Sequence, residues 1–258
     1  MPFCADLFYR YYDGGPSSFV YPTIFLHGLG GTHLSWPHSL RRIPGQRVYA
    51  LDLPGHGLSE IAARCSVHSL ATDLQRFTSG LGFFYFALVG HSLGSAVAFE
   101  FARLFPQQIR GLALISFGRE FSYMKEIRSF FDSERTRQKA IDLLSQKGFY
   151  AKFPRSLRQE ILSPLNKIRL SVLQADLGVC SSFLANCSVE NFLFPVQLIS
   201  GRDDQLVPLI EVKKLKYYLP NASLKIINEC GHMAIFEQTD TARTTLQDFL
   251  IIVTKPDY

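Results

Sequence analysis

The chain has 258 residues, which suits one large α/β domain with an insertion better than two independent domains. Hydrophobic residues make up 47% and charged residues 19%, so a sizeable core can form and an intrinsically disordered chain is excluded. The formal net charge is +5 and the basic residues are scattered, which argues against a nucleic-acid-binding face.

Short apolar runs alternate with helical patterns along the chain, which indicates a mainly parallel sheet covered on both faces. Residues 7–12 and 19–21 flank a turn signal at 13–16 and predict an N-terminal antiparallel pair. Buried strands are expected at 23–26, 47–51, 84–89, 109–117, 196–200 and 224–227. Helices are expected at 95–105, 208–219 and 239–253.

The segment 119–191 interrupts this alternation, because it holds helical patterns at 125–131, 135–144 and 157–162 and no clear strand. It lies between two predicted strands of one sheet. We therefore expect an inserted helical cap over a pocket, not an independent domain, with 1–118 and 192–258 as the core. Its excess of basic residues favours acidic esters or thioesters of anionic carriers. Its aromatic residues are candidates for an acyl pocket or for core packing: Phe121, Phe130, Phe131, Phe149, Tyr150 and Phe153.

Cysteine usage and the absence of long apolar segments bear on the cellular compartment of the protein. The cysteines are few, far apart and odd in number, without metal-ligand spacing: Cys4, Cys65, Cys180, Cys187 and Cys230. The N-terminus carries Asp6 and no apolar stretch, which argues against a signal peptide, and no segment approaches the ~20 apolar residues of a membrane span. We expect a soluble cytoplasmic protein with no metal, no nucleic-acid partner and no stable membrane insertion; the sequence leaves its oligomeric state open.

The run Gly90–Gly94, which reads Gly-His-Ser-Leu-Gly, follows an apolar strand and opens a helix. This is the context of a nucleophile elbow, in which small flanking residues let a strand turn sharply and project a strained serine. Ser92 is therefore the predicted nucleophile. A serine hydroxyl needs a base within hydrogen-bond reach, because it is a poor nucleophile at neutral pH.

His232 is the expected base, because it follows the last predicted strand and so lies at the same sheet edge as Ser92. His91 adjoins the serine but leaves the elbow in another direction, which makes it a packed spacer. The base needs an acid to fix its tautomer, and both Asp203 and Asp204 follow another strand at this edge. Three further histidines are expected at the surface or in caps: His33, His38 and His68.

The negative oxygen of a tetrahedral intermediate needs hydrogen-bond donors that are already in place. The backbone N–H of Leu93, at the start of the helix after the nucleophile, is one expected donor. The other is expected from the glycine-rich loop 27–32, where we choose the N–H of Leu29. Together they form a predicted oxyanion hole.

These residues together resemble the α/β-hydrolase superfamily over nearly the whole chain outside the predicted cap. The motifs that carry the resemblance are His27–Gly31, Asp52–Ser59, Gly90–Gly94, Gly201–Pro208 and Gly231–His232. The resemblance implies an eight-stranded, mostly parallel sheet with helices on both faces and a helical cap. It also implies that His56 is structural. In the family's pattern the acid lies three residues after the glycine and four before the proline, which selects Asp204.

The first functional hypothesis is hydrolysis of a small-molecule carboxylic ester or thioester through an acyl-enzyme on Ser92, without a cofactor. The same residues fit a C–C bond hydrolase or a related lyase, and also a ligand-sensing protein that retains the triad, because the fold hosts all of these. Haloalkane dehalogenases are disfavoured, because their elbow carries an aspartate.

Overall fold

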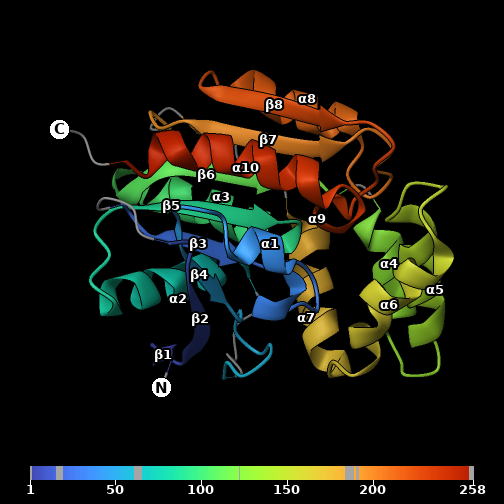
Figure 1. Ribbon diagram of the computed structural model, residues 1–258. Helices are drawn as coiled ribbons and strands as arrows, with labels where there is room; N and C mark the ends of the chain where they lie inside the picture. Colours follow the sequence, from blue (N-terminus) through green and yellow to red (C-terminus); the bar gives the residue numbers. More distant parts are fainter. Residues whose placement is uncertain are drawn as a thin grey trace.

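The computed structural model describes residues 2–15, 20–60, 66–121, 123–183, 189 and 192–255. Strands in this part of the chain form one eight-stranded sheet (Figure 1). They are β1 (Phe3–Cys4), β2 (Leu7–Asp13), β3 (Thr23–Leu26), β4 (Arg47–Leu51), β5 (Phe86–His91), β6 (Ile109–Ile115), β7 (Val196–Gly201) and β8 (Ala222–Ile227). The predicted α/β fold with an eight-stranded, mostly parallel sheet is confirmed.

The strands lie in the order β1-β2-β4-β3-β5-β6-β7-β8. β2 pairs antiparallel with β1 and β4, and all other neighbours are parallel. The expected pairing of residues 7–12 with 19–21 is wrong, because Tyr9–Asp13 form a continuous ladder with β4 instead. Phe19 lies outside the described residues, and Val20 and Tyr21 belong to no strand.

Helices cover both faces of the sheet because successive side chains of a buried strand point to opposite sides. In β3, Ile24 and Leu26 join one hydrophobic cluster and Phe25 joins the other. The first cluster includes α2 (Val67–Gly80), α3 (Leu93–Leu104) and α8 (Leu209–Tyr218). The second includes α1 (His38–Arg41), α9 (Ala234–Glu237) and α10 (Thr239–Val253).

Between β6 and β7 the described chain is mainly helical. It forms α4 (Met124–Phe130), α5 (Arg137–Lys147), α6 (Arg155–Leu162), the 3-10 turn η3 (Ser163–Asn166) and α7 (Leu170–Ser182). We call residues 119–183 the helical segment, which gathers beside one edge of the sheet (yellow to green in Figure 1). Its role as a cap and the expected domain boundaries stay predictions.

None of the helices in the described ranges combines the length and the apolar character needed to cross a lipid bilayer. The cytoplasmic location therefore stays a prediction.

The loops after β3, β5, β7 and β8 carry the predicted site residues. These strands are parallel to one another, so their carboxyl ends lie at the same edge of the sheet. The sequence motifs at His27–Gly31, Ser92, Asp204 and His232 follow these strands directly.

Candidate active site

Ser92 occupies a strained turn between β5 and α3. Its backbone has φ 52° and ψ −115°, in a region that side chains other than glycine rarely adopt. The turn is held by the Ser92 N–H, which donates to the carbonyl oxygen of Ile115 at 2.9 Å. A Cβ on Gly90 would collide with the backbone of Gly94, and one on Gly94 with the backbone of Leu26. The glycines on both sides are therefore required by close backbone approach.

Ser92, His232 and Asp204 form one continuous hydrogen-bonded chain. The Ser92 Oγ lies 2.8 Å from His232 Nε2, and His232 Nδ1 lies 2.8 Å from Asp204 Oδ2. Asp204 Oδ2 can only accept, so His232 carries its proton on Nδ1 and Nε2 accepts from the serine hydroxyl. All three residues are buried, with 4%, 3% and 4% of their surface exposed.

The structure places Asp204, and not Asp203, beside the histidine. Asp204 Oδ1 accepts from the N–H groups of Leu206 and Val207 at 2.8 and 2.9 Å, which orients its other oxygen toward His232. The side chain of Asp203 is exposed. Of the two candidate acids, Asp204 therefore contacts His232.

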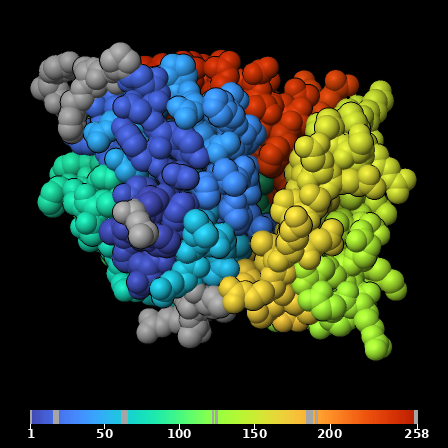
Figure 2. All heavy atoms as spheres, turned by 60° about the horizontal axis from the view of Figure 1, so that its bottom comes forward, coloured from blue at the N-terminus to red at the C-terminus, as the bar shows by residue number. Residues whose placement is uncertain are grey.

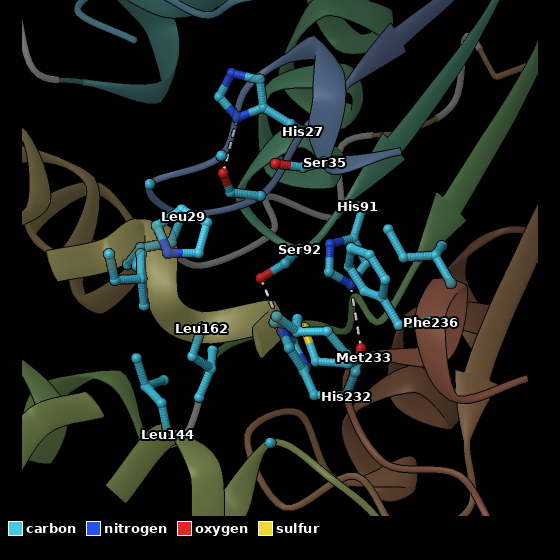
Figure 3. Close-up of a pocket in the computed structure, with 18 of the residues that line it drawn as sticks. His27, Leu29, Ser35, His91, Ser92, Leu144, Leu162, His232, Met233 and Phe236 are labelled. Carbon is cyan, nitrogen blue, oxygen red and sulfur yellow. Dashed lines mark hydrogen bonds between the residues drawn. The ribbon is translucent and has the colours of Figure 1, made fainter. Parts of the chain in front are cut away.

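His91 holds the backbone of His232 rather than reaching Ser92. Its Nε2 donates to the carbonyl oxygen of His232 at 3.1 Å, and the Ser116 hydroxyl donates to the same oxygen at 2.6 Å. Burial, together with the neighbouring His232, lowers the pKa of His91 to about 3, so its ring is neutral. Figure 3 shows the two histidines side by side, with only His232 directed at Ser92.

The expected oxyanion donors lie beside Ser92. A Cβ on Gly28 would be 3.4 Å from the Cβ of Ser92, so the loop 27–31 packs directly against the elbow. Within the described ranges, the N–H groups of Leu29 and Leu93 donate to no protein acceptor. The role of these two N–H groups as oxyanion donors stays a prediction.

Comparison with known proteins identifies the family. A sequence model described as alpha/beta hydrolase fold matches residues 21–147 and 122–239, and so most of the chain. The chain belongs to the alpha/beta hydrolase family. The resemblance seen in the sequence motifs is therefore confirmed.

Individual relatives of this α/β-hydrolase are distant. Protein ABHD8 of Mus musculus is 25% identical over 244 residues, and the match covers 90% of this chain but only 56% of that protein. The chain thus spans about half the length of the first curated relatives that it matches. The 2-hydroxy-6-oxononadienedioate/2-hydroxy-6-oxononatrienedioate hydrolase 1 of Dechloromonas aromatica is 27% identical, with 95% of this chain and 91% of that protein covered. A solved thermophilic esterase is 26% identical with a TM-score of 0.78, covering 96% of this chain and 98% of that one.

A cavity of about 90 Å³ opens onto Ser92 and His232 in this α/β-hydrolase. The core contributes the loop 27–31 and neighbouring side chains (Figure 3). The helical segment contributes Leu144, Gly148, Ile161, Leu162, Pro164 and Leu165. In Figure 2 the surface is hollowed where the blue N-terminal part meets the yellow helical segment. The cavity therefore lies between the core and the helical segment.

The lining of the cavity is mainly apolar. Of the described residues that line it, none is Asp, Glu, Lys or Arg. None of the six aromatic candidates of the helical segment lines it either, and Phe121, Phe131 and Phe149 are buried in the main hydrophobic cluster. The side chains that the helical segment contributes to the cavity wall are thus aliphatic.

Glu237 holds the loop that carries His232, although no sequence motif points to it. Its carboxylate accepts from the N–H groups of Gly231 at 3.0 Å, Met233 at 3.1 Å and Tyr150 at 2.7 Å. Burial raises the pKa of Glu237, although these three donors lower it in part. The only sequence signal was an acid five residues after the histidine, which by itself does not reveal three backbone partners.

The prediction that His33 lies at the surface or in a cap is wrong. His33 is buried, and both its backbone N–H and its Nδ1 contact Asp52 Oδ1, at 2.6 and 2.8 Å. Asp52 Oδ2 also accepts from the N–H of Leu58 at 3.0 Å, so this carboxylate ties two loops of the core together. His68, by contrast, is largely exposed.

Proposed function

We propose that this α/β-hydrolase cleaves carboxylic esters or thioesters through an acyl-enzyme on Ser92, with His232 as the base and Asp204 as the acid that orients it. The observation that carries the proposal is the unbroken hydrogen-bonded chain from Ser92 through His232 to Asp204, facing a cavity. The solved thermophilic esterase of similar structure supports the proposal of ester hydrolysis.

Acylation begins when Ser92 Oγ attacks the carbonyl carbon of the substrate. The serine proton moves to His232 Nε2, and Asp204 stabilises the resulting imidazolium. The carbonyl oxygen becomes negative and accepts hydrogen bonds from the N–H groups of Leu29 and Leu93. When the tetrahedral intermediate collapses, the bond to the leaving alcohol or thiol breaks and His232 gives that group its proton.

Deacylation repeats the sequence with water as the nucleophile. His232 takes a proton from the water as it attacks the acyl carbon, and the same two N–H groups receive the negative oxygen. Collapse of this second intermediate breaks the bond to Ser92 Oγ. His232 returns its proton to the serine, which releases a carboxylic acid and regenerates the starting state.

The cavity favours a small, uncharged acyl group. Its volume of about 90 Å³ is below the several hundred Å³ usual for drug-sized ligands, and its lining is mainly apolar. Because the helical segment supplies one of these walls, we propose that residues 119–191 act as a cap that sets acyl specificity.

Cleavage of a C–C bond is the second candidate, because a relative from Dechloromonas aromatica carries the name of such a hydrolase. That name denotes a substrate with two carboxylates. A buried carboxylate is costly unless a cation pairs with it, and no Lys or Arg is among the described residues of the cavity wall. The ester reaction is therefore favoured over the C–C reaction.

Hydrolysis of p-nitrophenyl esters of increasing acyl length, beside matched thioesters and a 2-hydroxy-6-oxo dienoate, tests the proposal. We expect turnover of the short esters that disappears in Ser92→Ala, and labelling of the wild-type chain alone by a fluorophosphonate. Turnover of the dienoate but not of the esters would establish the second candidate. Saturable ligand binding without turnover of any substrate would establish the sensor.

A further inference from the structure

Three buried polar side chains that the proposed reaction does not use converge on the loop 27–31. His27, His56 and Asp176 are only 1%, 2% and 6% exposed. His27 follows β3 and His56 lies in the loop after β4, whereas Asp176 comes from α7 of the helical segment. Side chains from three separate parts of the chain thus meet at the loop that carries Leu29.

The peptide group between Gly28 and Leu29 is held by its carbonyl oxygen. His27 Nδ1 donates to this oxygen at 2.8 Å, and the N–H of Gly31 donates to it at 3.0 Å. His27 Nε2 accepts from the N–H of Leu53 at 3.0 Å, which places the ring proton on Nδ1. Because a peptide group is planar and its C=O and N–H point in opposite directions, these bonds also set the direction of the Leu29 N–H.

The next peptide group, between Leu29 and Gly30, is held by Asp176. The N–H of Gly30 donates to Asp176 Oδ2 at 2.9 Å. Gly30 has φ +61°, and a Cβ there would collide with Leu165 and Leu173 of the helical segment. With the peptide groups on both sides held, the two soft backbone dihedrals of Leu29 have little freedom left.

His56 holds Asp176 in place. Its Nε2 lies 2.9 Å from Asp176 Oδ2 and its Nδ1 lies 3.1 Å from the carbonyl oxygen of Pro54. Both nitrogens face oxygens that only accept, so both carry protons and the ring is positive. Burial lowers the pKa of His56, but Asp176, Pro54 and Asp52 more than offset this, so the net pKa is raised.

We propose that Asp176, seated against His56, is a positioning residue that aims the N–H of Leu29 at the carbonyl oxygen of the substrate. The inference rests on the proposed function, since an oxyanion donor acts only if Ser92 attacks a carbonyl carbon. It also couples the helical segment to the chemistry, because α7 must be seated on the core for Asp176 to hold the loop.

Steady-state hydrolysis of p-nitrophenyl acetate by three variants tests the proposal. Asp176→Ala removes the carboxylate oxygen that accepts from the N–H of Gly30. Asp176→Asn keeps an oxygen there and loses the negative charge. Gln174→Ala is the matched control on α7, because in the described part of the chain Gln174 donates only to carbonyl groups of the helical segment, with Phe131 at 3.0 Å. A double variant, His56→Met/Asp176→Leu, removes both charges together and so leaves no unpaired buried charge.

We expect Asp176→Ala to lower kcat by about 10- to 100-fold, part of the roughly 10²- to 10³-fold lost when an oxyanion donor is removed outright. KM should stay within about twofold, since the loss falls on the transition state. The double variant should lose as much as Asp176→Ala, Asp176→Asn should lose less, and Gln174→Ala should match the wild type. Affinity for a boronic acid, whose tetrahedral adduct on Ser92 places an oxygen at the oxyanion donors, should fall in parallel with kcat.

Thermal unfolding of each variant shows which ones are folded. If either Asp176→Ala or the double variant is folded and keeps the kcat and the boronic acid affinity of the wild type, the positioning role is overturned. A rise in KM without a fall in kcat also overturns it. So does an equal fall in kcat in Gln174→Ala, which would indicate a general effect of the helical segment. A wild-type chain without Ser92-dependent hydrolysis would instead refute the proposed function.

Discussion

Replacement of Asp204 by asparagine tests the hydrogen-bonded chain at its carboxylate end. Asp204 Oδ1 accepts from two backbone N–H groups, and Oδ2 faces His232 Nδ1. An asparagine that keeps its oxygen on the two N–H groups must turn its NH₂ toward His232. The ring then protonates on Nε2 and cannot accept the proton of Ser92. We expect kcat/KM to fall by about 10³- to 10⁴-fold, or about 4 to 5.5 kcal/mol in the barrier.

The assay is hydrolysis of a p-nitrophenyl ester by Asp204→Asn, with Asp203→Asn as the matched control. Asp203 adjoins Asp204 and carries the same charge, but its side chain is exposed. Asp203→Asn should stay within about threefold of the wild type, because an exposed charge contributes little. Circular dichroism and thermal unfolding should show that both variants are folded. Equal losses in the two variants, or a near-normal rate in Asp204→Asn, would refute the assignment of the acid.

Three other substitutions probe the elbow, the cavity and the buried ion pair. Gly90→Ala should destabilise the fold by about 1–3 kcal/mol in urea unfolding, because its Cβ meets the backbone of Gly94. Gly178→Ala is the control, since within the described ranges its Cβ meets nothing within 4 Å. Leu162→Ala enlarges the cavity and should raise the kcat/KM ratio of butyrate to acetate esters by about tenfold; an unchanged ratio would remove Leu162 from the acyl site. The raised pKa of His56 means that its stabilising contribution is complete below about pH 6.5 and disappears as pH rises through the folded value. The difference in Tm between the wild type and His56→Gln should therefore be larger at about pH 6 than at about pH 9, and the opposite trend would contradict the ion pair.

Two buried or partly buried arginines of the helical segment bind backbone carbonyls. Arg137 donates to Leu165, Asn166 and Ile168, and Arg158 donates to several carbonyls that include Tyr150. No basic residue is among the described residues of the cavity wall. The excess of basic residues in this segment therefore does not support the expectation of an anionic substrate.

The sequence patterns predicted some helices and missed others. The predicted helix 239–253 coincides with α10, which buries residues such as Leu246 and Leu250 on one side. α7 was not predicted, because its apolar residues are spread around the helix and its buried side even includes Asp176. α2 was also missed, although Leu70, Leu74 and Phe77 at helical spacing after the N-cap Ser66 were a usable signal.

The sequence by itself determined the parallel strands, the elbow at Ser92 and the loops that carry His232 and Asp204. These features depend on local patterns, in which apolar runs, glycines and turn residues act on their near neighbours. Only the tertiary structure decided what surrounds them, such as the pairing of β2 with β4, the contacts of Glu237 and the convergence of His56 and Asp176 on Gly30. His56 and Asp176 are 120 positions apart in the chain, and no local pattern carries a contact at that separation, because it is made only when α7 packs on the core.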